Sequence, residues 1–210
     1  MEIKHSWQNA EYLFIKNVCS EDELRLCKNE LEILSFGLET PEKTGSAKDE
    51  NGKLKKENKS IFFHDAYVSK FGDYSPCTSI VDKVIKVARS VNFTPHSIFN
   101  YMAQNFVNYN LLFSAYSNND YYEAHRDIAT LTLLFWLKNK NFTGGDLKFT
   151  DFNEEIPFED NSVIIFPSHY QHEVSKVNTS EDGYVRYVIS AFINPTQPPI
   201  ETGTKNENNN

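Results

Sequence analysis

Cysteine is scarce in this sequence, and its positions argue against two common kinds of site. The chain of 210 residues has 3 cysteines, Cys19, Cys27 and Cys77, and no two of them form a Cys-x-x-Cys pair. This pattern is not that of a zinc site built from thiolates or of a disulfide framework. The scarcity indicates a reducing compartment, so we expect a cytoplasmic protein.

Long apolar runs and an excess of positive charge are also missing. No apolar run approaches the roughly 20 residues that cross a bilayer, and the first residues lack the apolar core of a secretory signal. The formal net charge of −8 supplies no basic face for non-specific binding of nucleic acid. We therefore expect neither a membrane nor a nucleic acid as partner.

Aromatic side chains, in contrast, are abundant. Phenylalanine occurs 16 times and tyrosine 11 times, and this abundance favours β structure with a core rich in rings. After Pro95, about eight short strand-like segments recur at intervals of roughly 8–12 residues, which is typical of a sandwich or barrel rather than of βαβ units. The clearest of these segments are residues 105–116, 121–127, 130–137, 146–149, 162–166, 172–177 and 184–193.

The first half of the chain predicts helices that support this β-rich half. Ser20 and Glu23 have the spacing of a capping box, and the apolar residues after them recur at helical spacing. Pro76 opens a second amphipathic segment. Strands are expected over residues 11–18 and 61–68, because both are short apolar runs.

Two segments are expected to lie outside regular structure. Residues 39–59 are charged and almost devoid of apolar side chains, which predicts an exposed, mobile loop that is either a lid or a tolerated insertion. The tail, residues 196–210, is expected to be disordered. We therefore expect one domain over residues 1–195, with an N-terminal support in 1–105 and a β core in 106–195.

The most informative stretch is Tyr121–Asp127, where His125 and Asp127 are two residues apart. In an extended strand alternate side chains share a face, so this imidazole and this carboxylate would point into one space. A second histidine, His172, follows in the segment Phe166–Val174. Two histidines and one carboxylate leave metal positions open, and this is the ligand set of non-haem Fe(II) oxygenases.

Each of these residues also has a simpler explanation. His125 and Asp127 are consistent with a buried hydrogen-bonded pair that holds no metal. His169 is a rival of His172, but their positions differ by three, an odd number, so in a strand they would face opposite sides. Arg186 resembles a surface cation, but it lies inside an apolar strand, where a buried arginine needs an anion.

Taken together, these patterns are specific enough to indicate a family. Residues 106–193 resemble the catalytic core of the 2-oxoglutarate/Fe(II)-dependent dioxygenase superfamily, in particular its prolyl 4-hydroxylase-like branch. The matching segments stand in the order of the family: Tyr122–Asp127, Thr132–Leu137, Gly144–Leu147, Phe166–Val174 and Arg186–Ser190. The resemblance implies a mainly β fold with flanking helices (α+β), whose core is a double-stranded β-helix of the jelly-roll or cupin-like kind.

The resemblance also implies roles for individual residues. The catalytic residues and metal ligands would be His125, Asp127 and His172. The residues that bind 2-oxoglutarate would be Arg186, which would pair with its distal carboxylate, Ser190 and Tyr116. With O2, the co-substrate would yield succinate and CO2 while an unactivated C–H bond is hydroxylated, and ascorbate is a further candidate cofactor.

The substrate is less well defined by the resemblance. A prolyl residue of a peptide or protein is the first expectation, and a small molecule is the alternative. Residues 178–183 lengthen the gap between His172 and Arg186, which indicates a longer hairpin turn. Collagen-type prolyl hydroxylases usually carry lysine where this chain has Arg186, and this difference argues against collagen-like substrates but not against the reaction type. Two other classes remain open: a cupin-type ligand-binding module, and a zinc or manganese hydrolase with Glu123 or Glu173 as its base. The sequence does not indicate an oligomeric state.

Overall fold

The computed structural model describes residues 1–6, 9–67, 75–94, 96–100 and 106–196. Two of the described helices are long, α1 (Glu21–Leu34) and α4 (Pro76–Ser90). The others are short: η1 (Ser35–Gly37), α2 (Pro41–Thr44) and α3 (Phe63–Ala66). None of the described helices combines the length and the apolar character that crossing a bilayer requires.

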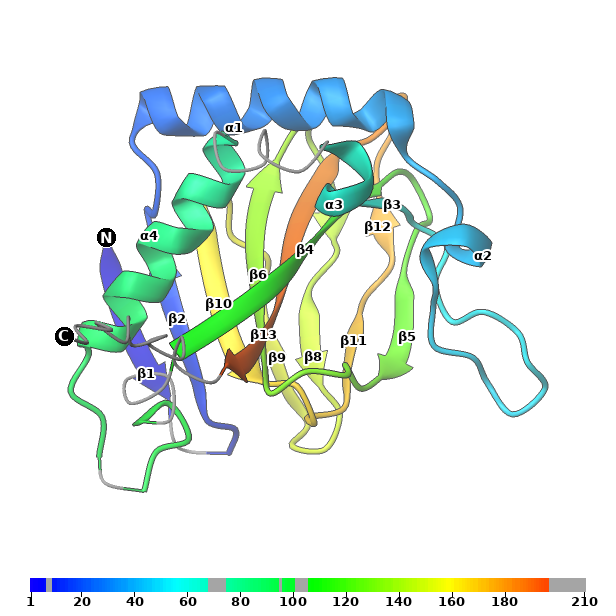
Figure 1. Cartoon of the computed structure of the whole chain (residues 1–210). Helices are drawn as coiled ribbons and strands as arrows, with labels where there is room; N and C mark the ends of the chain where they lie inside the picture. Colours follow the sequence, from blue (N-terminus) through cyan, green and yellow to red (C-terminus); the bar gives the residue numbers. More distant parts are fainter. Residues whose placement is uncertain (7–8, 68–74, 95, 101–105, 197–210) are drawn as a thin grey trace, which may run out of the picture.

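A seven-stranded antiparallel sheet forms the centre of the structure, in the order β1-β2-β10-β6-β13-β4-β3 (Figure 1). Its strands are β1 (Glu2–Ser6), β2 (Tyr12–Lys16), β3 (Lys59–Phe62), β4 (Phe106–Tyr116), β6 (Leu131–Lys138), β10 (Ser162–Pro167) and β13 (Arg186–Thr196). A four-stranded sheet, in the order β5-β11-β8-β9, covers part of one face. Its strands are β5 (Tyr122–His125), β8 (Leu147–Phe149), β9 (Glu154–Ile156) and β11 (His172–Val174). A short ladder joins β7 (Thr143–Gly144) to β12 (Val177–Asn178).

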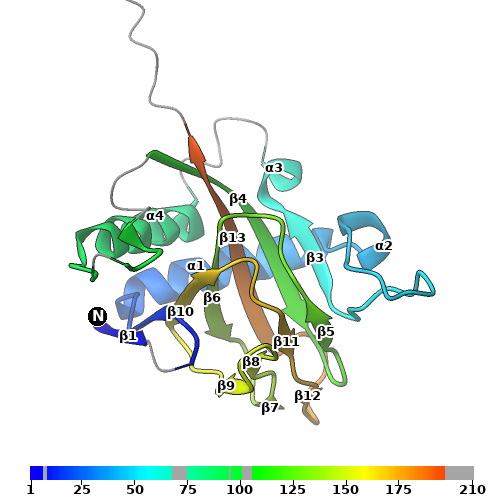
Figure 2. The same cartoon turned by 90° about the horizontal axis from the view of Figure 1, so that it is seen from below.

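Alternate side chains of the large sheet enter two different cores. On β6, Leu133 and Phe135 pack with side chains of α1 and α4, while Leu134 and Trp136 pack with side chains of the smaller sheet. The same alternation runs along β2, β4, β10 and β13, because successive side chains of a strand point to opposite faces. Figure 2 shows the two helices on one side of the large sheet and β5, β8 and β11 on the other. The face between the sheets is therefore the one available for a pocket.

The two long helices begin where the sequence predicts. Ser20 caps α1: its hydroxyl accepts from the backbone N–H of Glu23, and the Glu23 carboxylate accepts from the backbone N–H of Ser20. Pro76 is the first residue of α4, behind the N-cap Ser75. Proline is tolerated there because the first helical N–H has no partner within the helix. Both predictions are confirmed.

Two expectations about secondary structure are wrong, and two short strands were missed. The strand expected over 61–68 ends at Phe62, and Phe63 begins the helical turn α3, since a short apolar run does not by itself distinguish strand from helix. Strand β5 ends at His125, so Asp127 lies just beyond it rather than within it. The edge strands β1 and β9 were not expected, because they are short and carry charged residues.

Residues 39–59 are not exposed throughout, contrary to expectation. The segment contains α2, and Pro41, Lys56 and Asn58 within it are buried. It adds to the free edge of β5: Glu123 donates its N–H to the carbonyl of Lys55, and Lys56 forms a bridge with Tyr122. These backbone bonds bring the segment next to the strand that carries His125. The tail expected to be disordered lies outside the described residues from 197 onwards.

Candidate active site

A cavity of about 730 Å³ lies between the inner face of the large sheet and the smaller sheet. Its floor is built from alternate residues of two paired strands, because even-numbered side chains of β4 and β13 share this face. These floor residues include Leu112, Ser114 and Tyr116 of β4 and Arg186, Val188 and Ser190 of β13. Strands β5 and β11 and residues 44–47 and 56 form the remaining walls.

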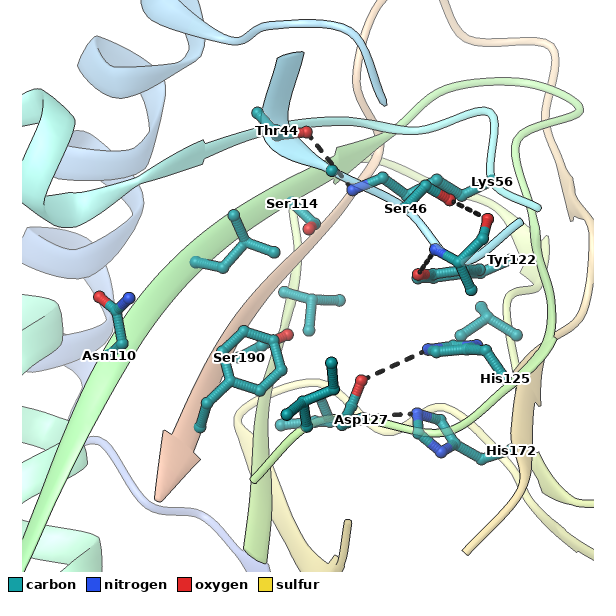
Figure 3. Close-up of a pocket in the computed structure, with 18 of the residues that line it drawn as sticks. Thr44, Ser46, Lys56, Asn110, Ser114, Tyr122, His125, Asp127, His172 and Ser190 are labelled. Atoms are coloured by element: carbon teal, nitrogen blue, oxygen red, sulfur yellow. Dashed lines mark hydrogen bonds and ion pairs between the residues drawn. The ribbon is translucent and has the colours of Figure 1, made fainter. Parts of the chain in front are cut away.

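His125, Asp127 and His172 meet in this cavity, although His172 stands 45 or more positions after the other two in the chain (Figure 3). The register of the smaller sheet brings the histidines together, because His172 is the direct partner of His125 in the β5–β11 ladder. Nε2 of His125 lies 3.6 Å from Oδ1 of Asp127, and Nε2 of His172 lies 3.5 Å from Oδ2. Two ligands of one metal, each about 2.1 Å from it and at right angles, are about 3 Å apart. The three groups therefore fit the ligand set of one metal ion.

The histidine rings present the correct nitrogen to the cavity. Nδ1 of His125 lies 2.9 Å from the carbonyl of Glu123, and Nδ1 of His172 lies 3.0 Å from the carbonyl of Tyr170. In a neutral ring Nδ1 then carries the proton and donates it, which leaves the lone pair of Nε2 for a metal. Burial, and after it the electrostatic interaction with the neighbouring His172 ring, lowers the pKa of His125 to about 3. The neutral ring, which is the form that binds metals, is thus favoured.

The carboxylate of Asp127 is held by residues outside the triad. Thr132 donates its hydroxyl hydrogen to Oδ2 of Asp127 at 2.7 Å, and the same hydroxyl lies 2.8 Å from that of Ser168. The backbone N–H of Asp127 donates to the carbonyl of Ser168 at 3.1 Å. These contacts fix the carboxylate after β5 has ended, and none of them follows from the His-x-Asp spacing.

The rival histidine lies outside the cavity, and the arginine between the ligands lines the cavity but has its charge paired. His169 is exposed and does not line the cavity. The guanidinium of Arg126 pairs with the carboxylate of Asp151 at 2.9 Å and donates to the carbonyl of His169. The charge of Arg126 is therefore already paired at the surface.

Arg186 is a buried cation with unused donors. Its side chain is 1% exposed, it lines the cavity, and Nε and Nη1 have no hydrogen-bond partner in the described part of the chain. Its guanidinium carbon lies 4.6 Å from the ring centroid of Tyr116 and 5.3 Å from that of Phe158. Burial lowers the pKa of Arg186, although an arginine remains charged in proteins. A buried guanidinium with free donors requires an anion.

Ser190 and Tyr116 lie on the same floor as Arg186. Tyr116 is the direct partner of Arg186 in the β4–β13 ladder, and Ser190 is four residues further along β13. Gly145 leaves room for the arginine: a Cβ atom there would lie 2.8 Å from Cδ of Arg186. In the sequence Gly145 stood out only as part of the matching segment Gly144–Leu147, since its contact with Arg186 is not local.

Other residues of the cavity were not predicted from the sequence. Lys56 reaches it from the segment 39–59, and the ring of Tyr122 stacks on that of His125 with centroids 3.5 Å apart. Tyr122 stands three residues before His125, so its position in a strand gave no indication of this stacking. Lys56 had no local signal, because its neighbours in the sequence are also charged.

The sequence of the β core matches a known family. Residues 111–194 match the 2OG-Fe(II) oxygenase superfamily, and this segment includes all three residues of the triad together with Arg186, Ser190 and Tyr116. No curated protein matches the chain. The resemblance predicted from the sequence motifs is confirmed.

The structure is similar to those of several oxygenases. For a viral collagen prolyl hydroxylase from Paramecium bursaria Chlorella virus-1, solved with 2OG, the TM-score is 0.54 at 15% identity, over 88% of this chain and 96% of the viral chain. For a prolyl-4-hydroxylase from Pseudomonas putida the TM-score is 0.56 at 13% identity, over 88% of this chain and 93% of that chain. For HygX from Streptomyces hygroscopicus, with nickel and 2-oxoglutarate bound, the TM-score is 0.56 at 9% identity, over 90% of this chain and 84% of that chain. At these identities the likeness concerns the fold, and it confirms the mainly β, double-stranded β-helix architecture.

Proposed function

We propose that this chain hydroxylates an unactivated C–H bond. The premise is that it belongs to the 2OG-Fe(II) oxygenase superfamily through residues 111–194. The single observation that carries the proposal is the presence in one cavity of two kinds of group. One is a triad of two histidines and a carboxylate with facing donor atoms. The other is a buried arginine with free donors.

In this proposal Fe(II) is held by Nε2 of His125, Nε2 of His172 and the carboxylate of Asp127. Two imidazoles and one carboxylate on one face leave positions for a bidentate 2-oxo acid and for O2. Bound there, Fe(II) supplies the activation of O2 that organic side chains do not provide. Thr132 keeps the carboxylate in place through its 2.7 Å hydrogen bond.

Arg186 would receive the distal carboxylate of 2-oxoglutarate. A guanidinium offers N–H donors in a planar fork that matches a carboxylate, and Nε and Nη1 of Arg186 are both unpaired. Ser190 and Tyr116, on the same floor, are proposed to complete the co-substrate pocket. The rings of Tyr116 and Phe158 restrict the guanidinium, which reduces the entropy lost on binding.

The overall reaction balances without a further reductant. One oxygen atom of O2 enters succinate as 2-oxoglutarate loses CO2, and the other replaces the hydrogen of a C–H bond by a hydroxyl group. A prolyl residue is the first candidate substrate, supported only by distant likeness to two prolyl hydroxylases. A small molecule is the alternative, and ascorbate remains a prediction.

The two other classes considered from the sequence are less well supported. A cupin-type binding module needs no buried cation such as Arg186 beside its metal. A hydrolase needs a general base near the metal, but Glu123 is exposed and neither Glu123 nor Glu173 lines the cavity. We further propose that the enzyme works in the cytoplasm on a peptide, protein or small-molecule substrate.

The proposal is tested with the Fe(II)-loaded protein, 2-oxoglutarate and ¹⁸O2, with peptide and metabolite pools as substrates. Succinate that carries one labelled atom and a product that gains one labelled oxygen are the expected result. Omission of Fe(II) or of 2-oxoglutarate is the control and should stop both products. Absence of labelled succinate under every condition would contradict the proposal.

A further inference from the structure

Lys56 is a second buried cation of the cavity, and the proposed reaction does not use it. Its side chain is 3% exposed and lines the cavity, and it comes from the segment 39–59. In Figure 3 the ring of Tyr122 lies between Lys56 and His125. The ammonium group lies 5.8 Å from the centroid of that ring, which itself stacks on His125.

The contacts of Lys56 are with neutral groups. Nζ lies 3.5 Å from Oγ1 of Thr44 and 3.4 Å from Oγ of Ser60, and Ser60 shares a 2.9 Å hydrogen bond with Ser114. Among the described residues no carboxylate pairs with it. Burial without a counter-charge lowers the pKa of Lys56 to about 8. A buried ammonium group is costly unless an anion pairs with it.

Of the two neighbouring cations, Lys55 and Arg126, only Arg126 has a carboxylate partner among the described residues. Lys55 donates to the carbonyl of Ala124 at 2.7 Å, and Arg126 pairs with Asp151 at 2.9 Å. Of the charges that line the described cavity, those of Arg186 and Lys56 form no ion pair with a carboxylate among the described residues, although Asp146 lies close enough to raise the pKa of Arg186. This leaves two anion sites to explain.

2-Oxoglutarate does not supply an anion for both. If the proposed function holds, one of its carboxylates binds the metal with the oxo group and the other pairs with Arg186. The charges of Fe(II) and Arg186 then balance those of Asp127 and the 2-oxoglutarate dianion, and the charge of Lys56 remains. A single excess positive charge in a buried site favours one monoanionic group on the other substrate.

We propose that the prime substrate carries a carboxylate that pairs with Lys56, with the hydroxyl groups of Thr44 and Ser60 beside it. This inference rests on the proposed function and specifies the substrate class of the same site. The ammonium group gives charge, and the hydroxyl of Ser60 can donate one hydrogen bond to a carboxylate oxygen when Ser114 is the donor of their shared bond. The hydroxyl of Thr44 already donates to the carbonyl of Thr40 at 3.3 Å. The carboxylate comes either from a free acidic compound or from an acidic residue of a peptide.

The test compares carboxylates with their uncharged counterparts. The protein is loaded with Zn(II) and 2-oxoglutarate, so that no turnover occurs, and binding is measured by saturation-transfer NMR. One arm uses amino acids and their primary amides, and the other uses peptides that contain glutamate and the same peptides with glutamine. In one arm at least one carboxylate should bind roughly tenfold or more tightly than its amide. The arm in which the preference occurs identifies the source.

Variants then assign the preference to one side chain. Lys56→Met should abolish the preference for the carboxylate, and Lys56→Arg, which keeps the charge, should retain part of it. Lys55→Met is the matched control, because it removes the adjacent charge outside the cavity, and it should keep the preference. If Lys56→Met does not fold, the inference is still tested by the carboxylate preference of the wild type and by its partial retention in Lys56→Arg.

Three results would overturn the inference. The first is that the wild type shows no preference for any carboxylate over its amide. The second is that Lys56→Met keeps the preference of the wild type. The third is that Lys56→Met weakens the binding of 2-oxoglutarate and leaves the binding of the carboxylate probe unchanged. The binding assay involves no turnover, so failure of the proposed function appears separately. In that case the carboxylate binds through Lys56, but the Fe(II) protein forms no succinate.

Discussion

The two buried cations of the cavity are held in different ways. Arg186 begins β13, where backbone ladders to Tyr116 and Lys138 fix it on both sides, and aromatic rings enclose its guanidinium. Lys56 belongs to a segment attached to the edge of β5 by a single bridge and a few backbone bonds, and hydroxyl groups surround its ammonium. A cation fixed by two ladders suits a co-substrate that is the same in every turnover. A cation on an added segment can vary without disturbing the sheet, which suits the substrate.

The largest effect is expected when a metal ligand is removed, because the metal site serves both the arginine end and the lysine end of the cavity. His172→Ala leaves two protein ligands and should reduce succinate formation below detection, because the remaining pair holds Fe(II) too weakly. The matched control is His169→Ala, which removes an exposed imidazole of the same segment and should leave turnover intact. Succinate is measured by mass spectrometry, and circular dichroism checks the fold. Equal turnover in the two variants would remove His172 from the metal site.

The next effect concerns the arginine end alone. Arg186→Met should raise the KM for 2-oxoglutarate roughly tenfold or more, because the distal carboxylate loses a charge-assisted pair. Arg186→Lys should recover part of this loss, since it keeps the charge but not the two parallel donors. KM is measured from succinate formation at varied 2-oxoglutarate. An unchanged KM in Arg186→Met would assign the co-substrate to another residue, with Lys56 as the first alternative.

The burial of Lys56 should make the stability of the protein depend on pH. The pKa of Lys56 is about 8 in the folded protein and 10.5 in the unfolded chain, so the unfolded chain binds more protons between these values. The free energy of unfolding of the wild type should therefore rise with pH over this window. The destabilisation that comes from burying the charged Lys56 is fully present below pH 8 and is at most about 3 kcal/mol.

Lys56→Met tests this dependence by calorimetry. The variant should melt several degrees above the wild type at neutral pH, at about 2–4 °C for each kcal/mol. The difference should shrink as the pH rises through the same window. A difference that does not depend on pH would mean that Lys56 is not destabilised by its burial.

A smaller effect tests the support of Arg186. Gly145→Ala places a methyl group 2.8 Å from Cδ of Arg186 and should raise the KM for 2-oxoglutarate as well as lower stability. Gly183→Ala is the matched control, because its φ of 76° is similar to the 72° of Gly145 but its nearest atom is 3.9 Å away. Both variants carry a backbone cost of roughly 1–2 kcal/mol. A KM effect of the same size in both would exclude the contact with Arg186 as its cause.

The smallest effect concerns the floor beside Arg186. Ser190→Ala should raise the KM for 2-oxoglutarate by a few-fold, corresponding to roughly 0.5–1.5 kcal/mol for one hydrogen bond. Initial rates at varied 2-oxoglutarate measure it. A rise as large as that of Arg186→Met would make the hydroxyl, rather than the guanidinium, the main anchor.

The sequence predicted those parts of the molecule whose signals are local. The capping box at Ser20 and the proline at the start of α4 depend on neighbouring residues, and both are correct. The triad was found because His125 and Asp127 are close in the chain and His172 stands in a recognisable motif. Even there the reason given was incomplete, since Asp127 lies beyond the strand and is positioned by Thr132.

The parts that were missed depend on contacts between distant residues. Lys56 lies in a charged segment that resembles a solvent-exposed loop, and its bridge to Tyr122 and its contacts with the hydroxyls of Thr44 and Ser60 make it part of the cavity. Gly145 reads as a turn until Arg186, 41 residues later, is placed beside it. Such contacts are set by the register of the sheets, and no local pattern encodes them.

The central claim is that one metal and one 2-oxo acid share this cavity. The most direct measurement is an anaerobic titration of the protein with Fe(II) and then 2-oxoglutarate, followed by visible absorption. A chelated 2-oxo acid should give a charge-transfer band that saturates at one equivalent of each and that is absent in His172→Ala. No band in the wild type, or the same band in the variant, would contradict the account.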